Sequence, residues 1–349
     1  MRRAVDIPDG LGVDELMRIA IGATHSTYPH PNPRVGALIL TPDHSVLSLG
    51  VHRGPGQPHA ETNALAAVSD SDTLVGATAL VTLEPCSHHG RTPPCAETLI
   101  EAGIAKVYVG AIDPDPRVSG LGIARLEAAG VEVVVGIASE DVVAADPGYF
   151  HHRRTGLPLV TLKVASTLDG QVAARDGSSQ WITGEEARED AHRLRSRHDA
   201  IAVGAGTVRA DNPHLTIRLD GYEGPQPLPV IVKGSEPLPP EAAILEREHL
   251  IYGGNGSEAD ISSMLKDLGT RGIVSLMVEG GPSLASSFLR EGAVDRIVWY
   301  LAGSIAGGVG RSAVSGVFET IADAKQVEVT DVSMFGGDVR ITAIPVGGH

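Results

Sequence analysis

Short apolar runs rich in β-branched residues alternate with longer apolar stretches of helical spacing along this chain. The first half contains three of each, with strands expected at 79–83, 107–112 and 131–135 and helices at 59–68, 96–102 and 121–129. Two parallel strands need a crossover connection of a dozen or more residues, and a helix usually provides it. The alternation therefore predicts an α/β fold with a largely parallel sheet covered by helices.

A helix, a proline-rich loop and a hairpin are expected before this alternation begins. Apolar residues at helical spacing predict a helix over 13–24, and prolines make 29–33 a rigid loop. Two apolar runs, 35–40 and 46–51, flank a turn and are expected to pair as a hairpin.

The length of 349 residues favours two domains rather than one. The first alternation ends near residue 150, where the polar and basic segment 148–156 precedes a new strand at 159–165. The second half repeats the alternation, with strands expected at 200–203, 230–232, 273–278 and 296–301 and helices at 185–197, 258–269 and 283–291. We therefore expect one domain over residues 1–150 and another over residues 151–349.

The charge balance limits the class of partner. The chain has 28 Lys and Arg against 43 Asp and Glu, a formal net charge of -15. Because nucleic-acid affinity comes from clustered basic residues, this excess disfavours RNA or DNA and favours a small molecule. An anionic substrate would need a few local arginines. The absence of a signal-peptide pattern and of a membrane-length apolar run, together with only two cysteines, predicts a cytoplasmic protein without a membrane partner.

Both cysteines of the chain lie in one segment, downstream of a His-x-Glu triplet. His59 and Glu61 stand at the start of a predicted helix, Cys86 follows a predicted strand, and Cys95 begins another helix. Zinc prefers thiolate ligands, and a helix N-terminus favours the thiolate of Cys95. One His and two Cys leave a fourth tetrahedral position for water, which is the catalytic pattern. Glu61 is then expected to carry the proton from the water to a leaving ammonia.

The spacing of the cysteines departs from the common zinc deaminase signature. Two residues usually separate them, whereas here the eight residues 87–94 intervene and add Arg91, which would meet an anionic substrate. Isolated cysteines are often only small buried residues, and a His-x-Glu triplet is common by chance. The order of all four residues in a strand-to-helix context nevertheless favours one zinc ion per chain.

Several turns in the second half contain glycine and adjoin predicted strands. They are 163–170, 178–184, the small-residue loop 204–213, and 279–284. A glycine-rich turn that opens a helix binds phosphate through free backbone N–H groups and the helix dipole. The same pattern is also that of an ordinary tight turn, and no Gly-x-Gly-x-x-Gly motif stands at the appropriate place. These residues alone leave cofactor binding open.

The chain resembles the bifunctional riboflavin-biosynthesis deaminase/reductase family over nearly its whole length. In the first half the resemblance rests on the segments 31–36, 50–52, 59–61, 84–95 and 113–116, of which the long cysteine loop is the most specific. It implies a cytidine-deaminase-like domain of three α/β/α layers, with zinc held by His59, Cys86 and Cys95. The implied reaction is hydrolytic deamination of 2,5-diamino-6-(5-phosphoribosylamino)pyrimidin-4-one, with Asn32 holding the pyrimidine. Asp115 stands where the family usually has Asn, which affects one substrate contact.

By the same resemblance, the second half is a dihydrofolate-reductase-like α/β domain that uses NADPH to reduce the ribosyl side chain to a ribityl chain. The implied NADPH contacts are Ala165, Trp181, Thr207, Asp211 and a loop over 281–287 that includes Gly281, Pro282 and Ser283. The implied contacts to the sugar phosphate are Ser179, Arg195, Leu215, Arg218 and Glu279. The arginines agree with the charge argument, because an acidic protein needs local bidentate donors to hold a phosphomonoester.

Two other interpretations stay open at this point. A nucleotide or nucleic-acid zinc deaminase with a non-catalytic or regulatory C-terminal domain would share the zinc chemistry, although RNA or DNA would need a basic groove. A binding or regulatory protein would have lost one activity, and the residues of the second half do not decide this. The family resemblance also implies a homodimer.

Overall fold

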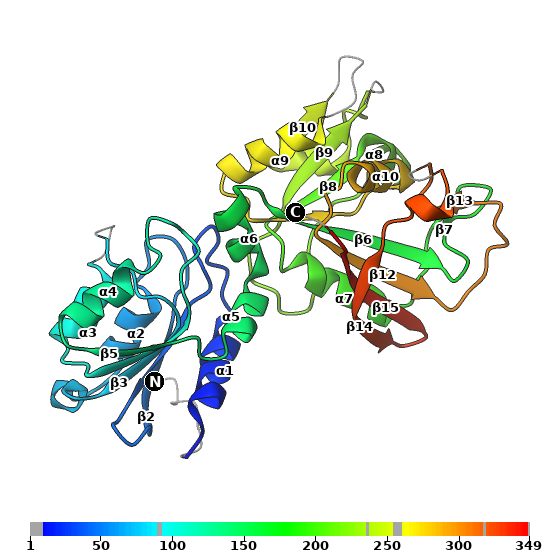
Figure 1. The fold of residues 1–349 in the computed structure, drawn as a ribbon. Helices are drawn as coiled ribbons and strands as arrows, with labels where there is room; N and C mark the ends of the chain where they lie inside the picture. The colour runs from blue at the N-terminus through cyan, green and yellow to red at the C-terminus, as the bar shows by residue number, and fades with distance from the viewer. Residues whose placement is uncertain (1–9, 89–92, 235–236, 254–259, 317–318, 348–349) are drawn as a thin grey trace. The chain divides into compact units, whose positions relative to one another are not determined.

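The computed structural model describes residues 10–88, 93–234, 237–253, 260–316 and 319–347. The chain divides into two compact units, Met1–Thr155 and Gly156–His349 (Figure 1). The boundary predicted after residue 150 falls inside helix α6 (Pro147–Thr155), which is the last element of the first unit. Within the described residues, every helix is too short or too polar to cross a membrane.

The first unit is built on a five-stranded sheet with the order β2-β1-β3-β4-β5. Its strands are β1 (Gly36–Leu40), β2 (Val46–Val51), β3 (Thr78–Leu83), β4 (Lys106–Ala111) and β5 (Glu132–Val135). Strand β1 is antiparallel to both β2 and β3, whereas β3, β4 and β5 are parallel. The predicted hairpin and the predicted parallel strands are therefore confirmed.

Helices cover both faces of this sheet. They are α1 (Val13–Thr24), α2 (Ala60–Ala66), α3 (Cys95–Glu101), α4 (Leu121–Ala128) and α5 (Ser139–Ala145), with a short 3-10 turn at Ser71–Leu74. Gly36 and Gly50 face opposite sides, because Gly50 pairs with Ala37, the neighbour of Gly36. A Cβ on Gly36 would lie 2.3 Å from the carbonyl oxygen of Ala20 in α1. A Cβ on Gly50 would lie 2.2 Å from that of Ala60 in α2. The two helices therefore approach the sheet from opposite sides, which gives the three predicted layers.

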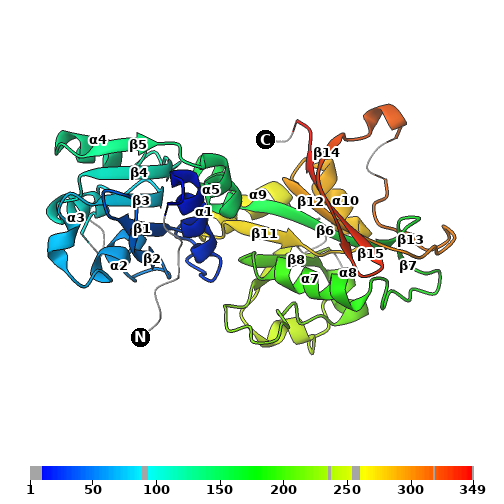
Figure 2. The same ribbon diagram turned by 90° about the horizontal axis from the view of Figure 1, so that it is seen from below.

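The second unit contains an eight-stranded sheet with the order β10-β9-β8-β11-β6-β12-β15-β14 (Figure 2). Its strands are β6 (Leu159–Thr167), β8 (Ala200–Gly204), β9 (Leu228–Lys233), β10 (Leu250–Gly253), β11 (Ser275–Val278), β12 (Arg296–Ala302), β14 (Val327–Phe335) and β15 (Asp338–Pro345). The strands from β10 to β12 are parallel, and β15 and β14 continue the sheet as an antiparallel hairpin. A separate small ladder pairs β7 (Gln171–Ala173) with β13 (Arg311–Ser312).

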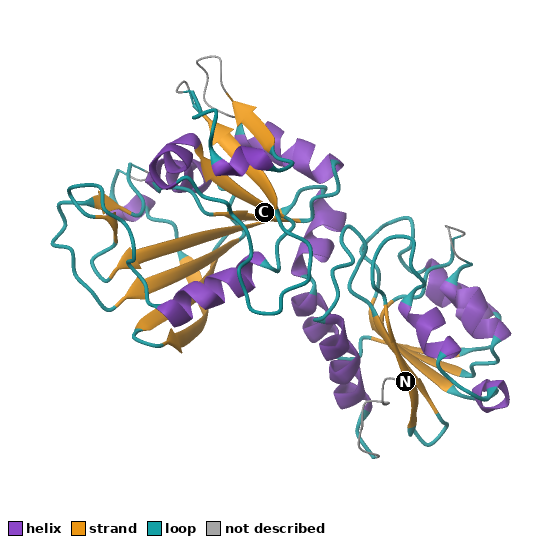
Figure 3. Cartoon of the chain, turned by 180° about the vertical axis from the view of Figure 1, so that it is seen from behind, coloured by secondary structure: helices purple, strands orange, loops and turns teal. Residues whose placement is uncertain are grey.

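Helices also cover both faces of the second sheet (Figure 3). They are α7 (Glu185–Arg195), α8 (Ala205–Asp211), α9 (Ile261–Thr270) and α10 (Pro282–Arg290), with 3-10 turns at Ala243–Glu246 and Ile321–Asp323. Alternate residues of β8 enter different cores. Ala200 and Ala202 belong to the core formed with α9 and α10, whereas Ile201 and Val203 belong to the core formed with α8. This alternation is the period-2 pattern of a strand buried on both faces.

Several segments of the second unit differ from the sequence-based expectation, and strands β7, β10 and β13 are among those not predicted. The segment 204–213 was expected to be a loop, but Ala205–Asp211 forms helix α8. Ala205 and Val208, three residues apart, are buried in this helix, and the small residues had hidden that spacing. The hairpin of β14 and β15 was not predicted, because a bulge between Val329 and Asp331 interrupts the period-2 alternation of apolar residues along β14.

Candidate active sites

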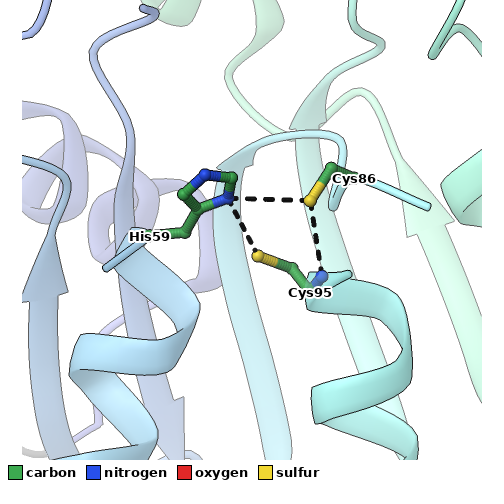
Figure 4. Close-up of side chains that lie close together, drawn as sticks. All are labelled: His59, Cys86 and Cys95. Carbon is green, nitrogen blue, oxygen red and sulfur yellow. Dashed lines mark hydrogen bonds between the residues drawn. The ribbon is translucent and has the colours of Figure 1, made fainter. Parts of the chain in front are cut away.

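Three zinc-ligand side chains converge where β3 ends and helices α2 and α3 begin. His59 is the N-cap of α2, Cys86 lies three residues after β3, and Cys95 is the first residue of α3. The Nδ1 atom of His59 is 3.2 Å from the Sγ of Cys95 and 3.6 Å from the Sγ of Cys86. Figure 4 shows the imidazole and both thiols pointing toward one another. The structure therefore brings together all three predicted ligands.

The arrangement of these three atoms fits a zinc ion. They lie within 4.8 Å of one another, and ligands bonded to tetrahedral zinc at about 2.0–2.3 Å lie roughly 3.5 Å apart. Among the described residues, no fourth His, Cys, Asp or Glu joins the group. Three protein ligands with one open position are typical of a catalytic rather than a structural zinc site.

The two thiols are hydrogen-bonded to one another and titrate as a pair. Hydrogen bonds from Cys95 and His59 lower the pKa of Cys86, which is therefore the more acidic thiol. The hydrogen bond to Cys86, together with burial, raises the pKa of Cys95. The prediction that Cys95 binds zinc as a thiolate concerns the metal-bound site, where the charge of the ion stabilises both thiolates. Zinc binding as a dithiolate consequently releases the proton of Cys95.

Glu61 lies in the first turn of α2, two residues after His59. Its side chain is only 3% exposed, and burial raises its pKa to about 7. A carboxyl group with a pKa near neutrality can both accept and return a proton at physiological pH. Glu61 is also outside the ligand group, so its carboxylate is available for proton transfer beside the metal position.

Asn32, the predicted pyrimidine contact, is held by a histidine next to the zinc ligands. The side-chain amide of Asn32 donates to Nε2 of His52 over 3.0 Å, and Nδ1 of His52 donates to the carbonyl oxygen of Pro58 over 3.1 Å. The rings of His52 and His59 meet edge to face, with centroids 5.2 Å apart. Burial lowers the pKa of His52, which keeps this ring neutral. No role was predicted for His52, although it lies in the segment 50–52 that supports the family resemblance.

The loop after β4 is attached to the segment that precedes Cys86. The carboxylate of Glu84 accepts hydrogen bonds of 2.9–3.3 Å from three backbone N–H groups of the 113–122 loop. In this loop, buried Asp115 forms a two-pronged ion pair with Arg117 at 2.9 and 2.6 Å, and these hydrogen bonds lower the pKa of Asp115 to about 2. The Asp that replaces the usual Asn is therefore charged and already paired. Arg91 lies outside the described residues.

A buried ion cluster in the second unit centres on Glu279, which follows β11. Arg195 at the end of α7 donates to its carboxylate over 2.6 and 2.8 Å, and the Nζ of Lys163 in β6 lies 3.9 Å away. Burial opposes ionisation of Glu279, but the charges of Arg195 and Lys163 outweigh it and lower its pKa to about 2. Burial lowers the pKa of Lys163. Lys163 had no predicted role, although a lysine within an apolar strand was a usable signal.

Two more predicted sugar-phosphate residues lie on a loop attached to this cluster. The Nη1 of Arg195 donates over 2.9 Å to the carbonyl oxygen of Thr216. The adjacent Leu215 is buried and has a φ of 53°, a left-handed conformation that is rare for leucine. The guanidinium of Arg218 has no hydrogen-bond partner within the described part of the chain. The structure therefore brings Arg195, Glu279, Leu215 and Arg218 into one region.

The structure brings only some of the predicted NADPH contacts together. Thr207 in α8 accepts a hydrogen bond of 3.1 Å from the backbone N–H of Gly281. Most of the segment 281–287 is not a loop, because helix α10 begins at Pro282, one residue before the start of the helix predicted over 283–291. The missing N–H of proline costs nothing at this first helical position. Trp181 is exposed and stacks on the guanidinium of Arg188 at 4.7 Å. Of the other predicted NADPH contacts, Asp211 lies one turn after Thr207 in α8, Ser283 lies in the first turn of α10, and Ala165 lies in β6. Ser179, a predicted sugar-phosphate contact, lies after β7.

Comparison with known proteins assigns each of the two units to a protein family. Residues 13–111 match the cytidine and deoxycytidylate deaminase zinc-binding region, and residues 158–340 match the RibD C-terminal domain. The riboflavin biosynthesis protein RibD of Bacillus amyloliquefaciens is 38% identical over 96% of this chain and 95% of its own length. The chain belongs to the RibD family. It is thus a riboflavin-biosynthesis deaminase/reductase, with a zinc-binding deaminase site at His59, Cys86 and Cys95.

Other RibD proteins agree over the same span. RibD of Mycobacterium tuberculosis is 40% identical and covers 95% of this chain and 97% of its own. The structure of Acinetobacter baumannii RibD matches with a TM-score of 0.90 at 35% identity, over 96% of this chain and 99% of that one. The diaminohydroxyphosphoribosylaminopyrimidine deaminase/5-amino-6-(5-phosphoribosylamino)uracil reductase of Thermotoga maritima matches with a TM-score of 0.86 at 33% identity, over 95% and 98% of the two chains. The two α/β units are therefore a cytidine-deaminase-like domain and a dihydrofolate-reductase-like RibD reductase domain.

Proposed function

We propose that the first unit removes the 2-amino group of 2,5-diamino-6-(5-phosphoribosylamino)pyrimidin-4-one by hydrolysis, and that the second unit then reduces the ribosyl side chain to a ribityl chain. The first step rests on one observation, a zinc site of three protein ligands with the buried carboxyl group of Glu61 beside it. Zinc bound there supplies Lewis acidity that brings the pKa of a water toward about 7. The names of the Thermotoga maritima enzyme support this substrate.

Glu61 is proposed to move the proton. It takes a proton from the attacking water and gives one to the amino nitrogen, which leaves as ammonia while the ring carbon gains a carbonyl oxygen. Because burial raises the pKa of Glu61 to about 7, it can take up and release the proton at little cost near neutral pH. Exclusion of bulk water from this buried carboxyl group keeps the proton at the reacting atoms.

Asn32 is proposed to orient the pyrimidine. Its amide nitrogen is already bonded to Nε2 of His52, and His52 is fixed by the carbonyl oxygen of Pro58. The Oδ1 atom of Asn32 is therefore the atom left to accept a hydrogen bond from the substrate. This chain of contacts makes His52 a positioning residue, because it acts on the substrate only through Asn32.

NADPH is the proposed hydride donor of the second unit, and C1 of the ring-opened ribosylamino group is the proposed acceptor. The cofactor carries the hydride, so the protein supplies binding and orientation. The proposed contacts are Ala165, Trp181, Thr207, Asp211, Gly281, Pro282 and Ser283. The bond between Thr207 and Gly281 supports a pyrophosphate position near the N-terminus of α10, where the N–H groups of the first turn have no acceptor within the helix.

The sugar phosphate is proposed to bind beside the Glu279 cluster. Arg218 is the proposed phosphate ligand, because its guanidinium is unpaired among the described residues. Arg195 is already bonded to Glu279 and to the carbonyl oxygen of Thr216, so it also positions these groups. Ser179 and Leu215 complete the proposed contacts. An arginine pair suits a phosphomonoester on a chain of net charge -15.

The decisive assay supplies the diaminopyrimidine ribosyl phosphate to the zinc-loaded chain with and without NADPH. We expect ammonia release in both cases, and NADPH oxidation only after ammonia has been released. Oxidation of NADPH before ammonia release would overturn the proposed order. Ammonia release without any oxidation of NADPH or NADH would refute the reductase step. Equal activity with NADH would refute the choice of NADPH alone.

We also propose that the chain forms a homodimer. Strand β14 lies at the edge of the second sheet and exposes four large apolar residues, Val327, Val329, Val332 and Met334, with exposed fractions of 42%, 54%, 62% and 65%. An exposed edge strand of this kind offers unpaired backbone groups to another strand. Sedimentation velocity should give twice the chain mass of 36.3 kDa. A single-chain mass at micromolar concentration would contradict the dimer.

A further inference from the structure

A cavity of about 650 Å³ lies at the edge of the second sheet where the parallel strands begin. Among its lining residues, Asp199 immediately precedes β8, and Leu228 and Leu250 are the first residues of β9 and β10. The proposed reductase residues Glu279 and Gly281 follow the other end of β11. The cavity is therefore distinct from the region where those residues meet.

Arg247 is the lining residue whose charge is not balanced. Its Nη2 donates to the carbonyl oxygens of His214 and Leu215, both at 3.3 Å, and its buried Nε has no hydrogen-bond partner. Within the described part of the chain, no carboxylate forms an ion pair with it. Arg271, another lining residue, differs in this respect because it is paired with Asp267 at 2.8 Å.

The rest of the lining indicates the chemistry of a ligand. Asp199 is already engaged, because one of its carboxylate oxygens accepts three hydrogen bonds of 2.9–3.0 Å. Glu248 also lines the cavity but is exposed to solvent. The remaining walls are largely apolar and include Pro227, Pro229 and Ile273. An unpaired guanidinium beside apolar walls suits a carboxylate or phosphate attached to a flat apolar body.

The cavity is connected to the loop that carries the proposed sugar-phosphate contacts. Arg247 holds the carbonyl oxygen of Leu215, whose left-handed backbone needs such support. Gln226, another lining residue, accepts a hydrogen bond of 2.7 Å from the backbone N–H of Ile217. From another side of the loop, Arg195 holds Thr216 and pairs with Glu279. The loop is thus held between the cavity and the ion cluster.

We propose that this cavity is a regulatory site for a small organic anion, which pairs with Arg247 and thereby tightens sugar-phosphate binding on the 214–218 loop. A bound anion fixes the guanidinium and reinforces its long bonds to the His214 and Leu215 carbonyl oxygens. The loop is then ordered before the sugar phosphate binds. Binding of the sugar phosphate therefore costs less conformational entropy. The regulatory part rests on the proposed reductase function, whereas anion binding in the cavity does not.

The test uses benzoate as the anion and ribose 5-phosphate as the sugar phosphate, with the full zinc-loaded chain. Isothermal titration should give a measurable dissociation constant for benzoate, and saturating benzoate should tighten ribose 5-phosphate binding about 5-fold, a typical allosteric coupling. Inorganic phosphate, which lacks the apolar body, should bind the cavity more weakly than benzoate. Neither measurement depends on turnover, so benzoate binding stays testable even if the chain reduces no substrate.

Matched variants on one strand locate the effect. Leu250 lines the cavity, whereas its neighbour Ile251 is exposed and does not. Leu250→Trp should fill the cavity, weaken benzoate binding at least about 10-fold and abolish the coupling, while Ile251→Trp should change both by less than about 2-fold. Arg247→Gln provides a second variant if Leu250→Trp fails to fold, and it should also lose benzoate binding.

Three results would overturn the proposal. Benzoate binding that survives both Leu250→Trp and Arg247→Gln would place the anion elsewhere. Weaker ribose 5-phosphate binding in the presence of benzoate, unchanged by Leu250→Trp, would mean direct competition at Arg218. Unchanged ribose 5-phosphate affinity at saturating benzoate would remove the regulatory role and leave only an anion site.

Discussion

The zinc site of the first unit and the ion cluster of the second unit are both buried and polar, but they are balanced differently. Glu279 in the second unit lies against the opposite charges of Arg195 and Lys163. The zinc ligands of the first unit include no Lys or Arg, so Cys86 and Cys95 can both be thiolates only when a metal ion lies between them. The comparison implies that the first site depends on a ligand for its integrity, whereas the second is complete as the chain folds.

Removal of zinc should show the largest difference between the two units. Chelation should abolish deamination and lower the unfolding temperature of the first unit, because metal binding contributes to folding. Both tryptophans, Trp181 and Trp299, lie in the second unit, so their fluorescence reports that unit alone. We expect the fluorescence transition to shift by less than about 2 °C while circular dichroism shows an earlier transition. A matching shift of the fluorescence transition would break the comparison.

Glu61→Gln should sharpen the comparison, because we expect it to lose most of the deaminase activity and to keep the zinc ion. Loss of the proton carrier should lower the deamination rate by about 10²–10⁴-fold. Zinc content, measured by atomic absorption, should stay near one ion per chain because Glu61 is not in the ligand group. Reduction of substrate that is already deaminated should be unaffected. Loss of zinc from this variant would show instead that Glu61 supports the metal site.

Unfolding at acidic pH should test whether the ionised carboxylate of Glu279 stabilises the second unit. The pKa of Glu279 is lowered to about 2, so its contribution to stability is present above about pH 4.5 and is lost as the pH falls toward 2. The difference between the ordinary pKa of 4.5 and the lowered pKa of about 2 corresponds to about 3 kcal/mol of unfolding free energy for this buried group. Urea unfolding followed by tryptophan fluorescence should show a smaller loss between pH 5 and pH 3 in Glu279→Gln than in the original chain. Equal losses would deny Glu279 this role.

Arg218→Ala should weaken sugar-phosphate binding about 10–100-fold, the range for a charge-assisted hydrogen bond. NADPH affinity, measured by fluorescence titration, should change by less than about 3-fold, because the proposed cofactor contacts lie on other segments. Arg188→Ala is a matched control on the same unit, since Arg188 stacks on Trp181 and should affect NADPH more than the sugar phosphate. Equal losses for both ligands would refute the assignment of Arg218.

Asp115→Asn is expected to have the smallest effect on stability. It removes an ion pair whose Arg117 partner is largely exposed, and such pairs contribute less than about 1 kcal/mol. The substitution also restores the residue usual in the family, so the Michaelis constant of deamination is the informative measurement. A change in that constant with unchanged unfolding would identify Asp115 as a substrate contact. A large loss of stability would contradict the exposed-pair interpretation.

The sequence predicted the first site almost completely, because its ligands fall within residues 59–95 and each marks the start of a helix or the end of a strand. It did not predict that Glu84 holds the segment 113–122 in place. Glu84 does so by accepting hydrogen bonds from backbone N–H groups, which no pattern of side chains reveals. In the second unit, Lys163, Arg195 and Glu279 come from β6, α7 and the end of β11. Only the strand order places them together, and periodicity does not give strand order. The exposed strand β14 was missed because a bulge between Val329 and Asp331 interrupts its alternation of apolar residues.

Gly50 has a consequence for the metal site, although it has no ligand atom. Helix α2, which carries His59 and Glu61 at its start, rests on this glycine so closely that a Cβ would lie 2.2 Å from the carbonyl oxygen of Ala60. Any side chain at position 50 therefore has to move the helix, and with it one of the three zinc ligands. The coordination geometry of this enzyme therefore depends on the absence of a side chain at position 50 as well as on the three ligands.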